Sequence, residues 1–432
     1  MKRVLCLILA LITLLSLFSL YSCSQPQGGG ESVNETAAES GEEKLPDETD
    51  GGKTPAQSGN SSPYSVFDPL TSSKKTAEPM VKVSDIADQY KVSLKNGVTF
   101  DPLTCPYFEI SGFPSLEENK SYYRMLLADA SKYPSGVNGN ATKSAGGRIR
   151  FRTNSSNMTI SVTLSSNPDI PYMTVLGSAG IDIYKGTGSA KTYFDSIYPS
   201  KGSSRYTETI KLSGSTEEYT LVLPLYSAIS NLTISLDTTA QVGKPTPYTY
   251  EKPVVFYGSS ITQGCSASRP GTSYTDVVTR MLDANLVNLG FSGGAKGEQI
   301  VADYIAGLEM SAFVLDYDYN ASSVDDLKNT HYNFYKTIRD AHPDIPIIIM
   351  TKNNVAMSTT DTNAKRRAVI KETYDKAVAA GDKNVYFIDG RYVYPEVARE
   401  LCTVDGTHPT DIGMYYMAQA VYPILKQALE GK

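Results

Sequence analysis

The sequence predicts two folded domains: an antiparallel β-sandwich over residues 81–245 and an α/β domain over residues 246–432. Three observations lead to this prediction. Apolar and polar side chains alternate in several stretches between residues 147 and 237, which is typical of strands with one buried face. A segment with two prolines, residues 241–251, interrupts this pattern. From residue 253 on, short apolar runs alternate with helical patterns.

The β-sandwich is predicted from stretches with a period of two residues. The alternating stretches are residues 149–151, 160–164, 221–225 and 232–236. Turn residues separate them, as in the segments Gly186-Thr187-Gly188 and Ser213-Gly214-Ser215. Several short strands at this spacing predict two antiparallel sheets packed face to face.

The α/β domain is predicted to contain a five-stranded parallel sheet with helices on both faces. The predicted strands are residues 254–257, 286–289, 312–317, 345–350 and 385–388, and the predicted helices are residues 274–282, 298–307, 324–341, 364–380 and 412–429. In such sheets ligands bind outside the carboxyl ends of the strands. Functional residues are therefore expected in the segments that follow the apolar runs.

The N-terminal residues resemble a bacterial lipoprotein signal. Lys2 and Arg3 precede an apolar stretch, and Cys23 follows it, so residues 1–22 are predicted to be removed and Cys23 to carry lipid. An ordinary signal peptide that is cut nearby is the alternative. Residues 23–80 are predicted to be a disordered tether, because their N-terminal part has almost no apolar residues. The predicted location is the cell envelope, with the chain lipid-anchored on the extracytoplasmic side of a bacterial membrane, or secreted.

Composition excludes several classes of function. The net charge of −6 over 432 residues argues against a nucleic-acid partner. The sequence has no zinc-spaced set of Cys and His, no P-loop and no dinucleotide motif, so we expect neither a metal nor a cofactor. Of three histidines, His331 lies inside a predicted helix and His342 at its end, where we expect packing and capping roles. His408 remains as the candidate base.

The segments at the strand ends contain a candidate nucleophile and its partners. Ser259 and Ser260 follow the first apolar run on a tight turn, and the turn alone does not decide between them. A serine hydroxyl needs a base at neutral pH, and His408 is the histidine on a strand-end loop. Asp405, three residues earlier, is suitably placed to orient the His408 imidazole.

The remaining strand ends offer hydrogen-bond donors for an oxyanion. A glycine-rich loop over residues 288–294 follows the second run, and Asn320 follows the third. The backbone N–H groups of Ser260 and Gly293 and the Asn320 amide could converge on one point. These are the groups that an acyl-transfer reaction requires.

The four loops resemble the four sequence blocks of the SGNH hydrolases, also called GDSL-type esterases. Residues 258–260 resemble block one, with Ser260 at the nucleophile position, and residues 288–293 resemble block two, with Gly293 as the oxyanion glycine. Asn320 resembles the asparagine of block three, and residues 405–408 resemble the final Asp-x-x-His. The resemblance implies the SGNH fold, a flavodoxin-like arrangement, with catalytic Ser260, His408 and Asp405.

Residues 180–184, Gly-Ile-Asp-Ile-Tyr, resemble the Gly-x-Asp-Leu-Tyr motif of the β-domain that precedes this hydrolase domain in one subfamily. The simpler interpretation is a structural strand in which Asp182 bonds locally, and the alternative is a role in lining the cleft. The resemblance implies a two-domain secreted serine esterase of a kind that often acts on acylated carbohydrates, so the expected substrate is an acylated small molecule or polysaccharide. The short loops without a cap suggest an open cleft and a small acyl group such as acetyl. A lipase, lysophospholipase or thioesterase is one alternative, and an inactive cell-surface carbohydrate-binding protein is another.

Three positions depart from the family pattern. Ser259 replaces the usual aspartate of block one. Asp318 replaces the usual glycine of block three, and Ala321 stands where a second aspartate is usual. A carboxylate beside an oxyanion would oppose the developing charge, so we expect Asp318 to bind a backbone amide, a substrate hydroxyl or Arg269.

Further predictions concern substrate contacts and a disulfide. The candidate substrate-binding residues are Asp318, Arg269, Asn353 and Asn354, of which the two asparagines follow the fourth apolar run and could instead form a turn. Cys265 follows block one, and Cys402 precedes Asp405 by three residues. Because both loops meet at the same site, a disulfide between Cys265 and Cys402 is predicted.

Overall fold

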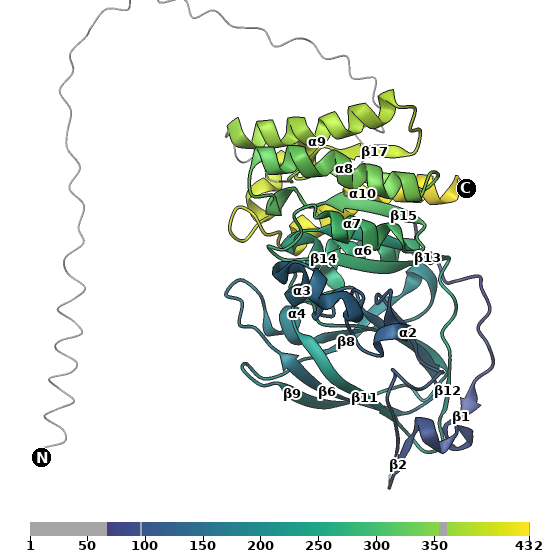
Figure 1. The fold of residues 1–432 in the computed structure, drawn as a ribbon. Helices are drawn as coiled ribbons and strands as arrows, with labels where there is room; N and C mark the ends of the chain where they lie inside the picture. The colour runs from purple at the N-terminus through teal and green to yellow at the C-terminus, as the bar shows by residue number, and fades with distance from the viewer. Residues whose placement is uncertain (1–66, 96, 354–360, 432) are drawn as a thin grey trace, which may run out of the picture. The chain divides into compact units, whose positions relative to one another are not determined.

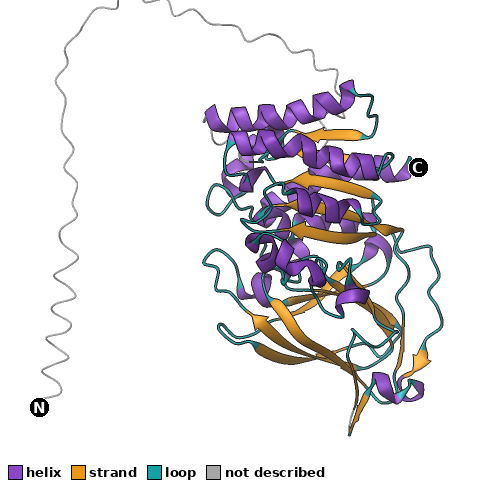
Figure 2. Ribbon diagram, viewed as in Figure 1, coloured by secondary structure: helices purple, strands orange, loops and turns teal. Residues whose placement is uncertain are grey.

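The computed structural model describes residues 67–95, 97–353 and 361–431 (Figure 1). The predicted signal segment 1–22, Cys23 and most of the predicted tether lie outside the described residues, as does Asn354. The fold contains two antiparallel sheets and one parallel sheet (Figure 2). The predicted architecture is therefore confirmed.

The β-domain, residues 81–245, forms the two antiparallel sheets. Its strands are β1 (Val81–Lys82), β2 (Val92–Leu94), β3 (Gly97–Phe100), β4 (Glu109–Ser111), β5 (Arg148–Thr153), β6 (Asn157–Ser166), β7 (Ile181–Lys185), β8 (Thr192–Ile197), β9 (Arg205–Lys211), β10 (Glu217–Val222), β11 (Ala228–Leu236) and β12 (Gln241–Gly243). One sheet has the order β1-β12-β5-β10-β7-β8, with β4 beside β5, and the other has the order β2-β3-β11-β6-β9. Alternate residues of β6, including Ile160 and Val162, are buried in the core between the sheets. The period-two pattern thus identified strands with one buried face.

The α/β domain contains the parallel sheet. Its strands are β13 (Tyr250–Gly258), β14 (Ala284–Gly290), β15 (Ala312–Asp316), β16 (Ile347–Met350) and β17 (Val385–Ile388), and its α-helices are α5 (Ser260–Gln263), α6 (Tyr274–Leu282), α7 (Gln299–Ala306), α8 (Val324–Ala341), α9 (Asp361–Ala379) and α10 (Asp411–Glu430). The strand order is β14-β13-β15-β16-β17. Val254 and Phe256 face a core that includes α6 and α10, whereas Val255 and Tyr257 face a core that includes α7, α8 and α9. Helices therefore cover both faces of the sheet.

The register of the parallel sheet brings three strand ends together. Gly258 of β13 pairs with Gly290 of β14 on one side and with Asp316 of β15 on the other. A Cβ atom on Gly258 would lie 2.0 Å from Thr262 Oγ1 and 2.4 Å from the Asp316 carbonyl oxygen. Glycine is therefore required here, because the chain turns directly into α5. The segments after β13, β14 and β15 consequently start at the same edge of the sheet.

One segment of the β-domain packs on the α/β domain. It contains α2 (Leu116–Asn119) and α3 (Ser135–Ala141). Tyr123, Met125 and Val137 from this segment share a core with strands β13 and β14. The last antiparallel strand ends at Gly243 and the parallel sheet begins at Tyr250, but this segment packs in the cores of both domains.

Residues 67–80 also belong to the fold. The Phe67 ring lies 4.8 Å from the Tyr422 ring, centroid to centroid, and Asp68 Oδ2 lies 2.6 Å from Lys426 Nζ. The prediction of a disordered tether is therefore wrong for this part of the chain, because Phe67 and Asp68 bind to α10 and Lys75 forms an ion pair with Glu251. Over the part of the chain that the structure describes, none of the helices combines the length and the apolar character needed to cross a bilayer.

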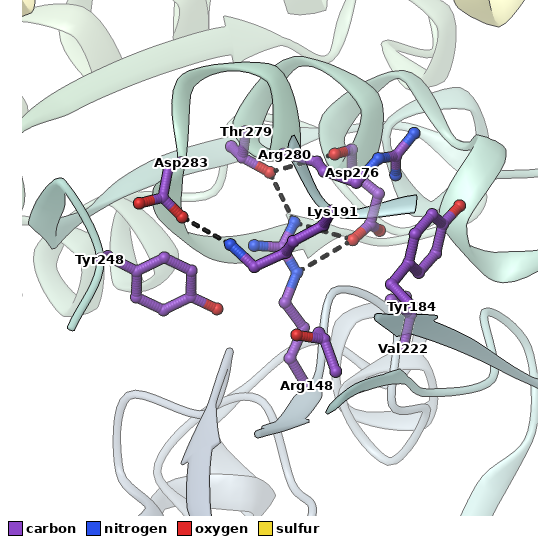
Figure 3. Close-up of a pocket in the computed structure, with 10 residues that line it drawn as sticks. Arg148, Tyr184, Lys191, Val222, Tyr248, Asp276, Thr279, Arg280 and Asp283 are labelled. Carbon is purple, nitrogen blue, oxygen red and sulfur yellow. Dashed lines mark hydrogen bonds and ion pairs between the residues drawn. The ribbon is translucent and has the colours of Figure 1, made fainter. Parts of the chain in front are cut away.

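Buried ion pairs join the β-domain to α6 around a small cavity (Figure 3). Arg148 Nη2 of β5 lies 2.9 Å from Asp276 Oδ1, and Lys191 Nζ lies 2.6 Å from Asp283 Oδ1. All four side chains are almost fully buried. Removal of one partner would leave a buried charge without compensation, which is strongly destabilising. These pairs therefore stabilise the contact between the β-domain and the segment of α6.

Candidate active site

The turn after β13 resolves the choice between the two serines. Ser259 is the N-cap of α5, and its Oγ accepts a hydrogen bond of 3.2 Å from the Ile261 N–H. Serine and aspartate are both good N-caps, so Ser259 performs a capping role that an aspartate could also perform. Ser260 is the first residue of α5, and its hydroxyl instead faces His408.

Ser260, His408 and Asp405 form a continuous hydrogen-bonded chain. Ser260 Oγ lies 3.0 Å from His408 Nε2, and His408 Nδ1 lies 2.8 Å from Asp405 Oδ2. A carboxylate only accepts hydrogen bonds, so Nδ1 carries a hydrogen, and in the neutral imidazole Nε2 is free to accept from the serine. The three residues that the sequence predicted as catalytic, Ser260, His408 and Asp405, are therefore in contact.

Backbone donors hold the Asp405 carboxylate in place. The N–H groups of Thr407 and His408 donate to Asp405 Oδ1 over 2.9 and 2.7 Å. Burial raises the pKa of Asp405, but the hydrogen bonds from His408 and Thr407 outweigh burial and lower it overall. Asp405 is therefore charged at neutral pH and oriented toward the imidazole.

The surroundings of His408 stabilise its protonated form. Burial lowers the pKa of His408, but the neighbouring Cys265 and Asp405 side chains raise it, and the result is a pKa of about 9. The ring of Tyr172, from the β-domain, stacks on the imidazole with centroids 5.0 Å apart. Tyr172 is 43% exposed, so it forms part of the surface beside His408.

The turn after β13 and the loop after β14 each present one unpaired backbone donor near this chain. Gly293 has φ +65°, and an added Cβ there would meet no atom within 4 Å. Among the hydrogen bonds of the described residues, the N–H groups of Ser260 and Gly293 have no acceptor. Asn320 Nδ2 donates to the Phe291 carbonyl over 2.9 Å, which ties the segment after β15 to this loop. The three predicted oxyanion donors are therefore on loops that meet.

A guanidinium from the β-domain supports the loop after β14. Arg124 is fully buried, and its Nη1 donates to the carbonyls of Asn288 and Gly290 over 2.7 and 2.9 Å. Its Nη2 donates to the Asn140 carbonyl, and Asn140 Nδ2 donates to the Ser292 carbonyl over 3.0 Å. Sequence reasoning missed Arg124, because its segment has neither a periodic pattern nor a family motif.

Two of the candidate substrate-binding residues serve the interior or the domain interface instead. Asp318 is 1% exposed and forms an ion pair of 2.8 Å with Arg366, and it also accepts from the Lys352 N–H. The expected backbone contact of Asp318 is therefore present. Arg269 was wrong as its partner, because Arg269 Nη1 lies 2.7 Å from Asp182 Oδ2.

Asn353, a further candidate substrate-binding residue, is buried shortly after the end of β16. Asn353 is 1% exposed, and its N–H donates to Tyr319 Oη over 2.9 Å. Its side-chain nitrogen and oxygen are buried without a hydrogen-bond partner among the described residues. Asn354, which directly follows, lies outside the described residues.

The predicted disulfide between Cys265 and Cys402 is not formed. Both residues are buried free cysteines, as is Cys105. The Cys402 thiol donates to the Ala398 carbonyl over 3.2 Å, whereas Cys265 lies beside His408 and Tyr172. The prediction was wrong because neighbouring loops do not ensure that two thiols point at each other.

The other two histidines have the structural roles expected of them. His331 is buried in α8, where its Nδ1 lies 2.9 Å from Thr373 Oγ1, and burial lowers its pKa to about 3. His342 is the C-cap residue of α8. Neither contacts Ser260, so His408 is the histidine of this site.

Comparisons with known proteins agree with this geometry. Residues 251–426 match the model of the GDSL-like lipase/acylhydrolase family, and residues 99–242 match the model GxDLY, the N-terminus of SGNH hydrolase-type esterases. The chain belongs to the SGNH hydrolases. It is accordingly an esterase-type hydrolase with the N-terminal β-domain of that subfamily. A search of curated proteins finds no match.

Solved structures share the two-domain fold of this SGNH hydrolase. A protein from Bacteroides ovatus described as a GDSL-like lipase is 28% identical, with a TM-score of 0.69 over 78% of this chain and 98% of that chain. The salicylyl-acyltransferase SsfX3 of a tetracycline biosynthetic pathway is 20% identical, with a TM-score of 0.64 over 77% and 98%. A family two carbohydrate esterase from Cellvibrio japonicus is 15% identical, with a TM-score of 0.50 over 77% and 98%. The last two show a common fold.

The raised pKa of His408 predicts an alkaline pH profile. His408 must be neutral to accept a proton. Therefore kcat/KM for an ester should be low at pH values where the imidazole is protonated and should increase with pH, with a midpoint of about 9. Replacement of Cys265 by Ala removes one of the groups that raise this pKa, and the profile should move to lower pH. A wild-type profile centred near 6.5 would contradict the proposed environment of His408.

Arg124 is predicted to maintain the loop that carries Gly293. Arg124→Met removes the donors to four backbone carbonyls, and loss of one oxyanion donor costs about a hundredfold to a thousandfold in turnover. We expect kcat to fall at least tenfold. Arg152→Met is the matched control, because Arg152 also donates to backbone carbonyls but lies away from the loop. An unchanged kcat in folded Arg124→Met would show that the loop does not need this support.

Proposed function

We propose that this protein is a serine esterase that hydrolyses short-chain acyl esters, acetyl esters above all, on carbohydrates. The hydrogen-bonded chain Ser260–His408–Asp405, with distances of 3.0 and 2.8 Å, is the observation that carries the proposal. Ser260 is 8% exposed, so its hydroxyl is near the surface rather than deep in the core. An inactive carbohydrate-binding protein would have no need for this chain of contacts.

In the proposed reaction Ser260 Oγ attacks the ester carbonyl while His408 Nε2 accepts its proton. Asp405 stabilises the imidazolium that forms. His408 then gives the proton to the leaving alcohol, and an acyl-enzyme ester on Ser260 remains. Water, activated by the same imidazole, hydrolyses this ester and restores the serine hydroxyl.

The negative oxygen of each tetrahedral intermediate would be held by the N–H groups of Ser260 and Gly293 and by the Asn320 amide. The first two donors have no acceptor among the described residues, so they are available without prior rearrangement. Asp318 does not oppose this charge, because its carboxylate is buried against Arg366. The departure from the family at position 318 is therefore compatible with catalysis.

A small acyl group suits the side of Ser260 on which the oxyanion donors of Gly293 and Asn320 lie. The loop residues there are Ser292 and Gly293, and the neighbouring side chain is that of Asn320, so this side is small and polar. A lipase, lysophospholipase or thioesterase would need apolar side chains to contact a long alkyl chain. Acetyl has only a methyl group beside its carbonyl, so it requires little apolar contact.

A sugar suits the other side of the site, where the alcohol leaves. Tyr172 stacks on His408 and is 43% exposed, so a partly exposed tyrosine borders the position where His408 would protonate the alcohol. Such a surface fits an alcohol that has both apolar faces and hydroxyl groups. The solved carbohydrate esterase described above shares the fold, which is consistent with this choice.

The test compares hydrolysis of 4-nitrophenyl acetate, 4-nitrophenyl octanoate and an acetylated oligosaccharide by wild type and Ser260→Ala. We expect activity on both acetyl esters, lost in Ser260→Ala, and little activity on the octanoate. Ser259→Ala is the matched control, because it removes the adjacent hydroxyl and should weaken only the N-cap of α5. Activity on the octanoate alone would favour a lipase, and acetate hydrolysis that survives in Ser260→Ala would exclude Ser260 as the nucleophile.

We further propose that Cys23 carries a lipid that anchors the chain on the extracytoplasmic side of a bacterial membrane. The support is the sequence of residues 1–23, in which two basic residues and an apolar stretch precede the cysteine. The full chain, expressed in a bacterium fed labelled palmitate, should incorporate label and sediment with membranes. Cys23→Ser should lose the label, and equal labelling of the variant would exclude Cys23.

A further inference from the structure

The β-domain binds a loop of the α/β domain through hydrogen bonds. This loop lies between the turn that carries Ser260 and helix α6. We define residues 268–272 as the bridging loop. Asp182 of β7 accepts at one oxygen, Oδ2, from Arg269 Nη1 over 2.7 Å and from the Gly271 N–H over 2.9 Å. Tyr184 Oη donates to the Gly271 carbonyl over 3.3 Å. The Gly-x-Asp-x-Tyr segment therefore binds the other domain through both of its polar side chains.

Asp182 is well placed to act as a rigid support. Its side chain is fully buried, and its second oxygen, Oδ1, accepts from Ser196 Oγ over 2.7 Å. A Cβ atom on Gly271 would lie 2.3 Å from Tyr184 Oη, so the loop backbone is seated directly on β7. Thr174 Oγ1 adds a hydrogen bond to the Ser268 carbonyl at the start of the loop.

The same loop holds the helix that follows His408. Asp411 is the first residue of α10 and lies three residues after His408. Asp411 Oδ1 accepts from the Ser268 N–H over 2.9 Å and from Thr272 Oγ1 over 2.8 Å, and Ser268 Oγ donates to Oδ2. The bridging loop is thus joined through the chain to the Ser260 turn and through hydrogen bonds to the start of α10.

We propose that Asp182 is a positioning residue for the esterase reaction. By fixing the bridging loop, it fixes Asp411 and the start of α10, and with them the separation of His408 Nε2 from Ser260 Oγ. This inference rests on the proposed function, and it adds a role for a residue of the β-domain that does not touch the reacting atoms. A displacement of about 1 Å at a reacting group can cost about a hundredfold in rate.

The experiment is a double-mutant cycle on turnover of 4-nitrophenyl acetate with Asp182→Ala and Asp411→Ala. Each single variant should lower kcat by about tenfold to a hundredfold with KM within about twofold, because substrate binding is unaffected. Both residues act through one loop, so their effects should not multiply. The kcat of the double variant should be close to that of the less active single variant. Asp182→Asn, which keeps an acceptor for the Gly271 N–H, should recover part of the rate.

Lys191→Met is the matched control for stability. Lys191 belongs to the same domain interface and pairs with Asp283 beyond the end of α6, and it does not contact the bridging loop. This variant should lower the midpoint of thermal unfolding but leave kcat unchanged. If Asp182→Ala lowers kcat no more than Lys191→Met does, or if the effects of the Asp182 and Asp411 variants multiply, the positioning role is refuted.

A readout without substrate separates this inference from the proposed function. Backbone hydrogen exchange over residues 403–414 should become faster in Asp182→Ala and stay unchanged in Lys191→Met. A wild-type protein without esterase activity would refute the proposed function, and the exchange rates would then decide the link between Asp182 and α10. Equal exchange in wild type and Asp182→Ala would refute that link, whatever the activity.

Discussion

The active site depends on contacts that the β-domain makes with loops of the parallel sheet. Arg124 binds the carbonyls at the end of β14, and Asp182 binds the bridging loop. Tyr172 of the same domain stacks on His408. The register of β13 with its neighbours brings the catalytic loops to one edge, but these contacts give the loops their final positions.

Electrostatic compensation explains how charged groups are accommodated around the site. Asp318, where the family has glycine, forms an ion pair with Arg366. Arg366 therefore compensates the charge of this carboxylate. Arg124 has only carbonyl partners among its hydrogen bonds, and burial lowers its pKa to about 9. Arg124 is thus a cation beside the loop of Gly293 that has no carboxylate as a partner. Such a cation favours a reaction in which negative charge develops near that loop.

The sequence predicted those features that have a local pattern. Helices α6 and α8 were predicted to the residue, because their apolar faces and caps lie within the segments themselves. Ser260, His408 and Asp405 were predicted from their places at strand ends and from the resemblance to a family, and the structure brings them into contact.

Features that depend on distant contacts could not be predicted in this way. The ion pair of Asp182 with Arg269 joins residues that are far apart in the sequence, and neither side chain has a local partner that indicates the other. Arg124 lies in a segment without periodicity, and it reaches the loop after β14 through tertiary packing. The predicted disulfide failed for the same reason, because the proximity of two loops does not determine where the thiols point.

The central claim is that Ser260 attacks the substrate and that three convergent donors receive the charge. A crystal structure after reaction with a fluorophosphonate that carries a short alkyl group tests this most directly. The account predicts phosphorus bonded to Ser260 Oγ, with the phosphoryl oxygen about 2.7–3.1 Å from the nitrogens of Ser260, Gly293 and the Asn320 side chain. An adduct on Ser259 or Cys265, or a phosphoryl oxygen that points away from these donors, would contradict it.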